Sequence, residues 1–233
     1  MSGVVEVRNL RKIYPMGEDE VVALGGVDLS IERGEFIAVM GPSGSGKSTF
    51  MQIVGMLDRA TSGSYAFEGR DVAALSDDER ADIRSRRLGF VFQSYNLLPR
   101  TSALENVELP MVYAGVPEKR RLEIALEKMD IVGIKSLADH MPNQMSGGQQ
   151  QRIAIARSLV NDPALILADE PTGALDTKTS RDVMRIFSDL NATRDITIML
   201  VTHEPDIAAF AKRIVTFRDG HILSDVPNVK RAA

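Results

Sequence analysis

The stretch from Gly41 to Thr49 constrains the fold of this chain more than any other part of its sequence. It contains the pattern G-x-x-x-x-G-K-S and reads Gly41-Pro42-Ser43-Gly44-Ser45-Gly46-Lys47-Ser48-Thr49. The apolar run 36–40 before it predicts a buried strand, and the apolar positions of 50–57 predict a helix packed on that strand. Strand, glycine loop and helix in this order form the context in which such a pattern binds phosphate. An ordinary glycine turn is the alternative, and the flanking elements disfavour it.

The chemistry of the loop supports phosphate binding. Glycines let backbone N–H groups converge on an anion without side-chain clashes, and the N-terminus of the following helix adds the positive end of its dipole. Lys47 supplies a point charge for the β- and γ-phosphates, and the hydroxyl of Ser48 is a ligand for Mg²⁺. We therefore predict that the chain binds a nucleoside triphosphate.

Composition excludes several kinds of site and partner for this chain. The chain has 233 residues and a net charge of −4, so no global charge attracts it to nucleic acid or anionic lipid. It has no cysteine, which excludes disulfides, thiolate nucleophiles and cysteine-ligated zinc. We find neither a signal-peptide pattern nor an apolar run near the ~18 residues of a membrane helix. We expect a soluble chain that meets a membrane only through a partner.

The remaining patterns predict an α/β fold. Alternation at 5–8 and 21–31 predicts an antiparallel β layer attached to a phosphate-loop NTPase core. Proline, glycine and helical periodicity from 94 to 155 predict a helical lobe inserted between strands of the core. We therefore expect one domain, 1–233, in which 1–93 and 156–233 form the core with its β layer and 94–155 forms the lobe.

An acid pair, Asp169-Glu170, ends the apolar run 165–168. We expect this strand to lie beside the strand that precedes the phosphate loop, which would place both acids in the crevice at the carboxyl ends of the strands. Asp169 would then hold Mg²⁺, and Glu170 would polarise an attacking water. A surface acid pair is the alternative, and the phosphate loop in the same chain disfavours it.

A second glycine-containing feature reads Met145-Ser146-Gly147-Gly148-Gln149. Ser146 and Gln149 have the spacing of a capping box, which predicts that a helix begins here. The two glycines leave the first amide groups uncovered and so create a second anion site, although one without a lysine. We expect this helix to cap the γ-phosphate of a nucleotide held by another subunit; a plain capped helix is the alternative.

Taken in order, these motifs resemble the ATP-binding subunits of ATP-binding-cassette (ABC) transporters. The resemblance rests on the phosphate loop, Gln93, Met145–Gln149, Leu165–Glu170, Ala174-Leu175-Asp176 and His203, and it covers nearly the whole chain. It implies an ATPase that powers a membrane transporter, with ATP and Mg²⁺ as ligands. It also implies a homodimer on ATP binding, in which each ATP is held by one subunit's phosphate loop and the other's signature helix. The chain would be cytoplasmic, peripheral at the inner face of the cell membrane through an integral membrane permease, without direct contact to nucleic acid.

The resemblance also implies roles for single residues. Tyr14 matches the aromatic residue that stacks on adenine; a core tyrosine is the alternative. Glu170 matches the general base and His203 the histidine that contacts the γ-phosphate, although a lone histidine after a strand is more often structural. Gln93 matches the residue that reaches Mg²⁺ and the attacking water. Asp176 matches the aspartate that links the two sites across the dimer.

These roles complete the expected site. Its catalytic residues are Glu170, His203 and Gln93. Its metal ligands are Ser48, Gln93 and Asp169. The nucleotide ligands are residues 41–49 with Tyr14, Ser146, Gly147, Gly148, Gln149 and Asp176. Two departures from the family pattern are small: Met145 replaces the usual leucine, and Glu204 stands where aspartate is common.

Residues 92–100, 106–110 and 170–176 look most like the macrolide-exporter and lipoprotein-releasing branch. We expect 92–100 to form part of the surface on which the permease docks. A soluble cassette ATPase acting on nucleic acid or ribosomes is the alternative function. Such proteins usually carry two cassettes or long coiled-coil insertions, and this chain has one phosphate loop and neither addition. A phosphate-loop kinase would leave 145–149 and His203 unexplained.

Overall fold

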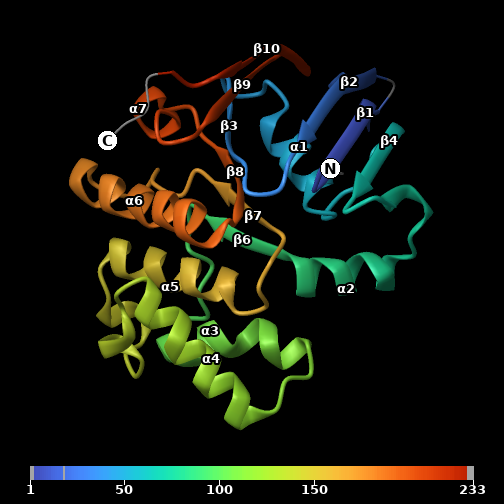
Figure 1. Ribbon diagram of the computed structural model, residues 1–233. Coiled ribbons are helices and arrows are strands. Elements are labelled where there is room, and N and C mark those ends of the chain that lie inside the picture. The colour runs from blue at the N-terminus through green and yellow to red at the C-terminus, as the bar shows by residue number, and fades with distance from the viewer. Residues whose placement is uncertain (1–2, 18, 230–233) are drawn as a thin grey trace.

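The computed structural model describes residues 3–17 and 19–229, which form two sheets and the helices around them (Figure 1). The larger sheet has six strands in the order β10-β9-β3-β8-β7-β6. Its pairs are parallel except for the hairpin of the last two strands in the chain. In chain order these strands are β3 (Phe36–Met40), β6 (Leu88–Phe92), β7 (Leu165–Asp169), β8 (Thr197–Val201), β9 (Arg213–Arg218) and β10 (His221–Pro227).

The expectation that the strand ending in Asp169 lies beside β3 was wrong. β8 lies between them, so that Val39 pairs with Val201, and Val201 pairs with Asp169. All three strands are nearly continuous apolar runs because both faces of a parallel sheet are buried. That pattern identifies buried strands but does not encode their order. The carboxyl ends of the strands still meet at one edge, so the acids stay at the crevice.

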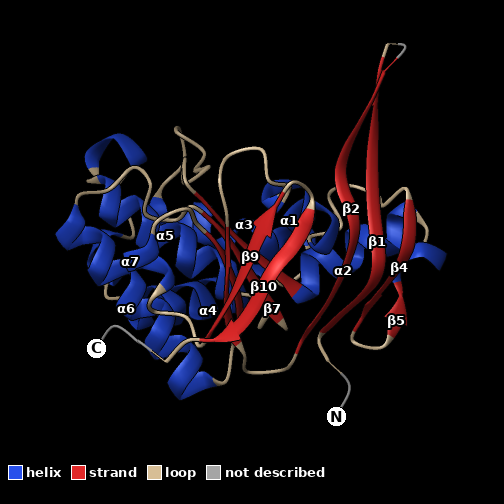
Figure 2. Cartoon of the chain, turned by 90° about the horizontal axis from the view of Figure 1, so that it is seen from above, coloured by secondary structure: helices blue, strands red, loops and turns tan. Residues whose placement is uncertain are grey.

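A smaller antiparallel sheet confirms the predicted β layer. Its order is β2-β1-β4-β5, formed by β1 (Val5–Met16), β2 (Asp19–Ile31), β4 (Ser62–Phe67) and β5 (Arg70–Asp71). β1 and β2 form a long hairpin that projects beyond the rest of the molecule (Figure 2). β1 is longer than the predicted strand at 5–8. Its pairing with β2 shifts register after Val7, and such bulges disturb the alternation from which a strand is read.

Helices cover both faces of the six-stranded sheet. Phe36 and Ala38 of β3 pack in one core with α5 (Gly147–Leu159), whereas the alternate residues Ile37 and Val39 pack in a second core with α1 (Lys47–Val54). Alternate side chains of a strand point to opposite faces, so α1 and α5 lie on opposite faces of the sheet. The helices are α1 (Lys47–Val54), α2 (Asp77–Arg87), α3 (Ala103–Tyr113), α4 (Glu118–Ile131), α5 (Gly147–Leu159), α6 (Thr177–Arg194) and α7 (Pro205–Ala208).

Residues 94–155 contain α3, α4, the first part of α5 and two short 3-10 segments at Lys135–Leu137 and Pro142–Gln144; a third such segment, Val72–Ala74, follows β5. α3 and α4 lie below α5 in Figure 1, away from the sheet. The predicted boundary at residue 155 falls inside α5, which ends at Leu159. The division into core and lobe stays a prediction. Within 3–17 and 19–229, no helix combines the length and apolar character of a membrane span.

Candidate active site

The phosphate loop connects the end of β3 to the start of α1 and needs glycine at several positions. Gly41, Gly44 and Gly46 have φ of 147°, 78° and 99°, where other residues are strained. A side chain on Gly41 would also collide with the carbonyl oxygen of Phe217. A Cβ on Gly46 would lie 2.5 Å from the carbonyl oxygen of Ala23. β2 and β9 therefore support the loop from outside.

Lys47 is buried at this loop. Its Nζ donates hydrogen bonds of 2.8 Å to the carbonyl oxygens of both Gly41 and Pro42. Burial lowers the pKa of Lys47, while the charges of Glu170 and Asp169 raise it. The hydroxyl of Ser45 is buried with no hydrogen-bond partner among the described residues. The loop thus holds one ammonium group and one free hydroxyl, both suited to phosphate oxygens.

The acid pair lies at the same edge of the sheet. Burial and then the charge of Glu170 raise the pKa of Asp169, and Lys47 opposes them. Glu170 has a left-handed backbone with φ of 43°, and its N–H donates to the carbonyl of Val201 at 2.9 Å. Two carboxylates beside a single ammonium leave an excess of negative charge that a cation would relieve.

The predicted metal ligands fit Mg²⁺ by their chemistry. Ser48, Asp169 and Gln93 offer hydroxyl, carboxylate and amide oxygens, which this hard cation prefers. The described residues contain no cluster of three or more histidine, cysteine, aspartate or glutamate residues that could hold a metal ion. The three predicted ligands fit an ion whose coordination is completed by phosphate oxygens and water, as is usual for Mg²⁺.

The candidate catalytic residues follow neighbouring strands. Nδ1 of His203, which follows β8, lies 2.8 Å from Oε1 of Glu170, which follows β7. Gln93 directly follows Phe92, the partner of Asp169 in the pairing of β6 and β7. The structure thus brings Gln93, Glu170 and His203 to one edge. Their roles stay predictions.

The signature helix begins as the sequence predicts. Ser146 and Gln149 form both hydrogen bonds of a capping box at the start of α5. A side chain on Gly148 would collide with the methyl group of Thr179 in the first turn of α6. Asp176 caps that turn, with Oδ1 accepting from the N–H groups of Lys178 and Thr179 at 3.1 Å. Asp176 is thus a helix cap within its own chain, and its role across a dimer stays a prediction.

Two contacts of α5 were not expected from the sequence. Gln151 is completely buried and donates to the carbonyl of Pro171 at 2.7 Å, directly after the acid pair. Arg157 donates to the carbonyls of Tyr95 and Asn96 at 2.8 and 2.6 Å. The run of glutamines at 149–151 was a visible signal for the first contact. Nothing in the sequence indicated the second, because its partners lie 61 and 62 residues away.

Tyr14 is half-buried near the end of β1, rather than a core residue. Its hydroxyl donates to Oδ2 of Asp58 at 2.7 Å, and the side chain of Thr49 interacts with the same hydroxyl. Burial and then the hydrogen bond to Asp58 raise the pKa of Tyr14. The candidate base-binding residue thus lies beside the last residue of the phosphate loop.

Comparisons with known proteins agree with this geometry. The profile of the family described as ABC transporter matches residues 24–173. The chain is 53% identical to the uncharacterized ABC transporter ATP-binding protein YknY of Bacillus subtilis, over 94% of this chain and 95% of that protein. It is 50% identical to the macrolide export ATP-binding/permease protein MacB of Syntrophobacter fumaroxidans, over 99% of this chain but only 33% of that protein.

A solved structure has the same fold. It is the dimeric post-hydrolysis state of the ATP-binding cassette MJ0796 bound to ADP and Pi, with a TM-score of 0.88 and 44% identity over 96% of this chain and 98% of that one. The predicted α/β fold and the predicted family are both confirmed. The chain therefore belongs to the ABC transporter family, as an ATP-binding subunit that hydrolyses ATP.

Proposed function

We propose that two copies of this chain close head to tail around two ATP molecules and that hydrolysis reopens them, which powers an export-type membrane transporter. The observation that carries this proposal is the placement of α1 and α5 on opposite faces of one sheet. A nucleotide on the phosphate loop before α1 is then capped by α5 of a second copy rather than by its own. The related cassette MJ0796 has been solved as a dimer, including a post-hydrolysis state bound to ADP and Pi, which supports a dimer that holds nucleotide.

The residues of one copy would divide the work as follows. Lys47 and the loop amides bind the β- and γ-phosphates, and Tyr14 stacks on adenine. Glu170 takes a proton from the attacking water, and His203 orients Glu170 through Nδ1 while its other ring nitrogen faces the γ-phosphate.

The metal ion would be held by Ser48, Asp169 and Gln93. When bound, Mg²⁺ neutralises charge on the phosphate oxygens. Across the dimer, Ser146, Gly147, Gly148 and Gln149 contact the γ-phosphate, and Asp176 links the two sites.

The strained backbone of Glu170 supports its catalytic role. A left-handed conformation in a residue other than glycine costs on the order of 1–3 kcal/mol and persists where surrounding structure enforces it. Here the hydrogen bonds from Glu170 N–H to Val201 and from the N–H of Gly173 to the Glu170 carbonyl enforce it. The conformation turns the chain sharply after β7, and the side chain meets His203 as a result.

We propose that the permease docks in a cavity of about 700 Å³ between α2, β6, α3 and α5. Its walls include Leu57, Phe90, Leu109 and Tyr113. Arg84 and Arg157 add positive charge, whereas Arg86 is paired at 2.6 Å with Asp82, which also lines the cavity. An apolar segment that carries an acidic residue is the occupant that fits this lining. Phe92 and Asn96 also line the cavity, in agreement with the predicted docking stretch 92–100, and Phe92 connects it to Gln93. Docking would place the chain at the inner face of the membrane.

Relatives that combine ATP-binding and permease parts favour export. The chain spans 33% and 34% of two such relatives named for macrolide export. We therefore propose that a separate or fused permease of this branch is the partner. Pull-down from a detergent extract distinguishes this proposal from the alternative of a soluble cassette ATPase. Recovery of an integral membrane protein supports it, and recovery of RNA or DNA without one contradicts it.

Light scattering tests the dimer directly. The Glu170→Gln protein should be monomeric alone and dimeric with ATP and Mg²⁺, because slow hydrolysis traps the closed state. The same protein carrying Ser146→Arg should bind ATP and stay monomeric, since a long side chain covers the start of α5. A Glu170→Gln protein that remains monomeric when saturated with ATP would contradict closure by these two sites alone.

A further inference from the structure

The surroundings of Tyr14 form a connected polar cluster. Lys12 donates from Nζ to Oδ1 of Asp58 at 2.7 Å and to the carbonyl of Arg59 at 2.8 Å. Tyr14 donates to the other carboxylate oxygen of Asp58 at 2.7 Å. The ammonium of Lys12 also lies 4.7 Å from the centroid of the Tyr14 ring. We call Lys12, Tyr14 and Asp58 the tyrosine clamp.

The charged groups of the clamp are partly buried, and each has hydrogen-bond partners. The side chains of Lys12 and Asp58 are only 12% and 28% exposed. Burial alone would raise the pKa of Asp58, but hydrogen bonds from Lys12, Tyr14 and the N–H of Arg59 outweigh it and hold the pKa below its usual value. Asp58 is therefore a carboxylate in the folded chain, and its two oxygens accept from Lys12, Tyr14 and the N–H of Arg59.

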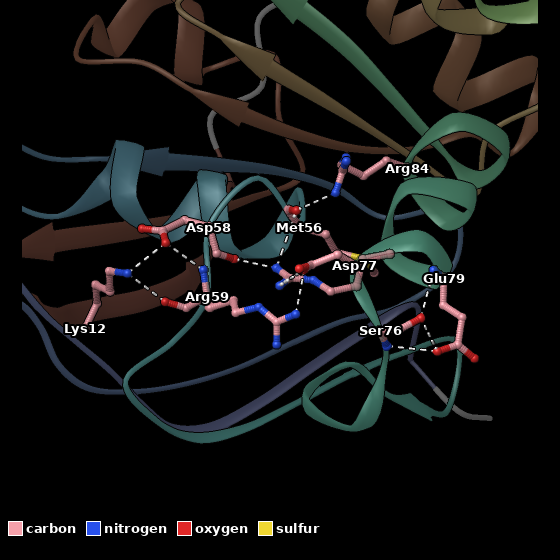
Figure 3. A network of polar contacts seen from close by, with 9 residues as sticks. Lys12, Met56, Asp58, Arg59, Ser76, Asp77, Glu79 and Arg84 are labelled. Atoms are coloured by element: carbon pink, nitrogen blue, oxygen red, sulfur yellow. Dashed lines mark hydrogen bonds and ion pairs between the residues drawn. The ribbon is translucent and has the colours of Figure 1, made fainter. Parts of the chain in front are cut away.

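The backbone of Asp58 is fixed from the other side by α2. Arg80, which is 5% exposed, donates to the carbonyl of Asp58 at 2.7 Å. Arg84 donates to the carbonyl of Met56 at 2.9 Å, as Figure 3 shows. The turn 56–59 is thus held between β1 and α2. A carboxylate on a turn held at both sides can fix the ring of Tyr14 before a nucleotide arrives.

The clamp also selects one face of the ring. An ammonium within about 6 Å of an aromatic centroid is attracted to the face of the ring. Lys12 therefore covers one face of Tyr14, and a planar ligand can stack only on the opposite face. Thr49, the last residue of the phosphate loop, interacts with the hydroxyl of the same tyrosine.

We infer that Lys12 and Asp58 are positioning residues that hold Tyr14 with one open face for a nucleobase. This inference rests on the proposed stacking of Tyr14 on adenine. Preorganisation of the ring improves affinity by reducing the entropy lost on binding. The clamp should therefore affect the binding of the base and leave the phosphates and the chemical step unaffected.

Calorimetric titration with ATP, and with inorganic tripolyphosphate as a probe that lacks a base, tests the clamp. Asp58→Asn and Tyr14→Phe should each weaken ATP binding about fivefold, the effect of one hydrogen bond. Lys12→Met should weaken it too. All three variants should raise KM for ATP with little change in kcat and leave tripolyphosphate affinity unchanged.

Asp189→Asn, on the exposed surface of α6, is the control for loss of a carboxylate. Urea unfolding checks that each variant keeps its stability.

Measurements in the Tyr14→Leu background distinguish failure of the clamp from failure of the proposed stacking. If Asp58 acts through Tyr14, then Asp58→Asn should cause no further loss of ATP affinity in that background. Wild-type ATP affinity in Asp58→Asn and Lys12→Met, with a loss in Tyr14→Leu, would overturn the clamp and keep the stacking. An equal loss of tripolyphosphate affinity in Asp58→Asn would also overturn the clamp. Wild-type affinity in Tyr14→Leu would overturn the stacking and the clamp together.

Discussion

Nδ1 of His203 lies 2.8 Å from Oε1 of Glu170, which joins the residues that follow two adjacent strands. A carboxylate can only accept, so the Nδ1 nitrogen carries the proton of this hydrogen bond. The Nε2 nitrogen of a neutral ring is then an acceptor, and it becomes a donor when the ring is protonated. In the proposed mechanism, this contact would set how both side chains meet a phosphate.

Replacing Glu170 by glutamine should lower kcat about 10²- to 10⁴-fold, the usual worth of a general base. ATP affinity should be retained, because the amide keeps the shape of the side chain. A phosphate-release assay and calorimetry measure the two quantities. Asp206→Asn, on the exposed start of α7, is the matched control. Hydrolysis at the wild-type rate in Glu170→Gln would remove Glu170 from the role of general base.

His203 and Glu170 should behave as one unit. His203→Ala should also lower kcat, and the double variant with Glu170→Gln should lose little more than the worse single variant, because residues in one hydrogen-bonded unit are not additive. A double-mutant cycle of kcat values measures this coupling. Fully additive losses would show that the 2.8 Å contact has no functional consequence.

Gly148→Ala should destabilise the fold although alanine favours helices. The added methyl group collides with the Thr179 methyl. Overpacking costs about 1–3 kcal/mol, whereas the helix preference of alanine offsets at most about 1 kcal/mol. Thr179→Ser removes the colliding methyl but keeps the hydroxyl that binds Asp176. Urea unfolding should therefore show a loss for Gly148→Ala in the wild-type background and none in the Thr179→Ser background.

Arg157→Lys should loosen the turn after Gln93. Tyr95 and Asn96 have left-handed φ angles of 59° and 49°, and Arg157 holds both carbonyls. A lysine cannot reproduce the two-pronged contact. Amide exchange within 94–98 should become faster. Arg152→Lys, also on α5, is the control, since Arg152 holds the carbonyl of Val132 instead. Unchanged exchange in 94–98 would mean that packing alone holds the turn.

Glu68 should make stability depend on pH in the acid range. Two hydrogen bonds from Arg87, of 2.8 and 2.7 Å, lower the pKa of Glu68 against the opposing effect of burial. The unfolded chain protonates this group near an ordinary pKa of about 4.3, before the folded chain does. Its stabilising effect is therefore complete above that pH and is lost as the pH falls toward the folded pKa.

The variant Glu68→Gln measures this effect. It should lower the free energy of unfolding at pH 7 by about 1 kcal/mol, since solvent screens a partly exposed pair. The difference from wild type should shrink below about pH 4.3. Glu123→Gln, in an exposed pair with Arg120, should show almost no difference at either pH. A Glu68→Gln deficit that is constant from pH 7 to pH 3 would exclude this electrostatic origin.

Local chemistry in the sequence determined the phosphate loop, the capping box at Ser146, the acid pair and the family. Each depends on residues within a few positions of one another, where spacing alone places backbone amides and side chains. The α/β core and its antiparallel β layer followed from apolar periodicity for the same reason.

The tertiary structure decided which distant segments of the chain lie next to each other and which contacts they form. The order of β3, β8 and β7 was wrong in the sequence-based prediction because each is a buried apolar strand, and nothing in such a run specifies its neighbour. The contacts of Tyr14 with Asp58 and of Arg157 with Asn96 span 44 and 61 residues and depend on how separate elements pack. The placement of α1 and α5 on opposite faces, on which the proposed dimer rests, has the same origin.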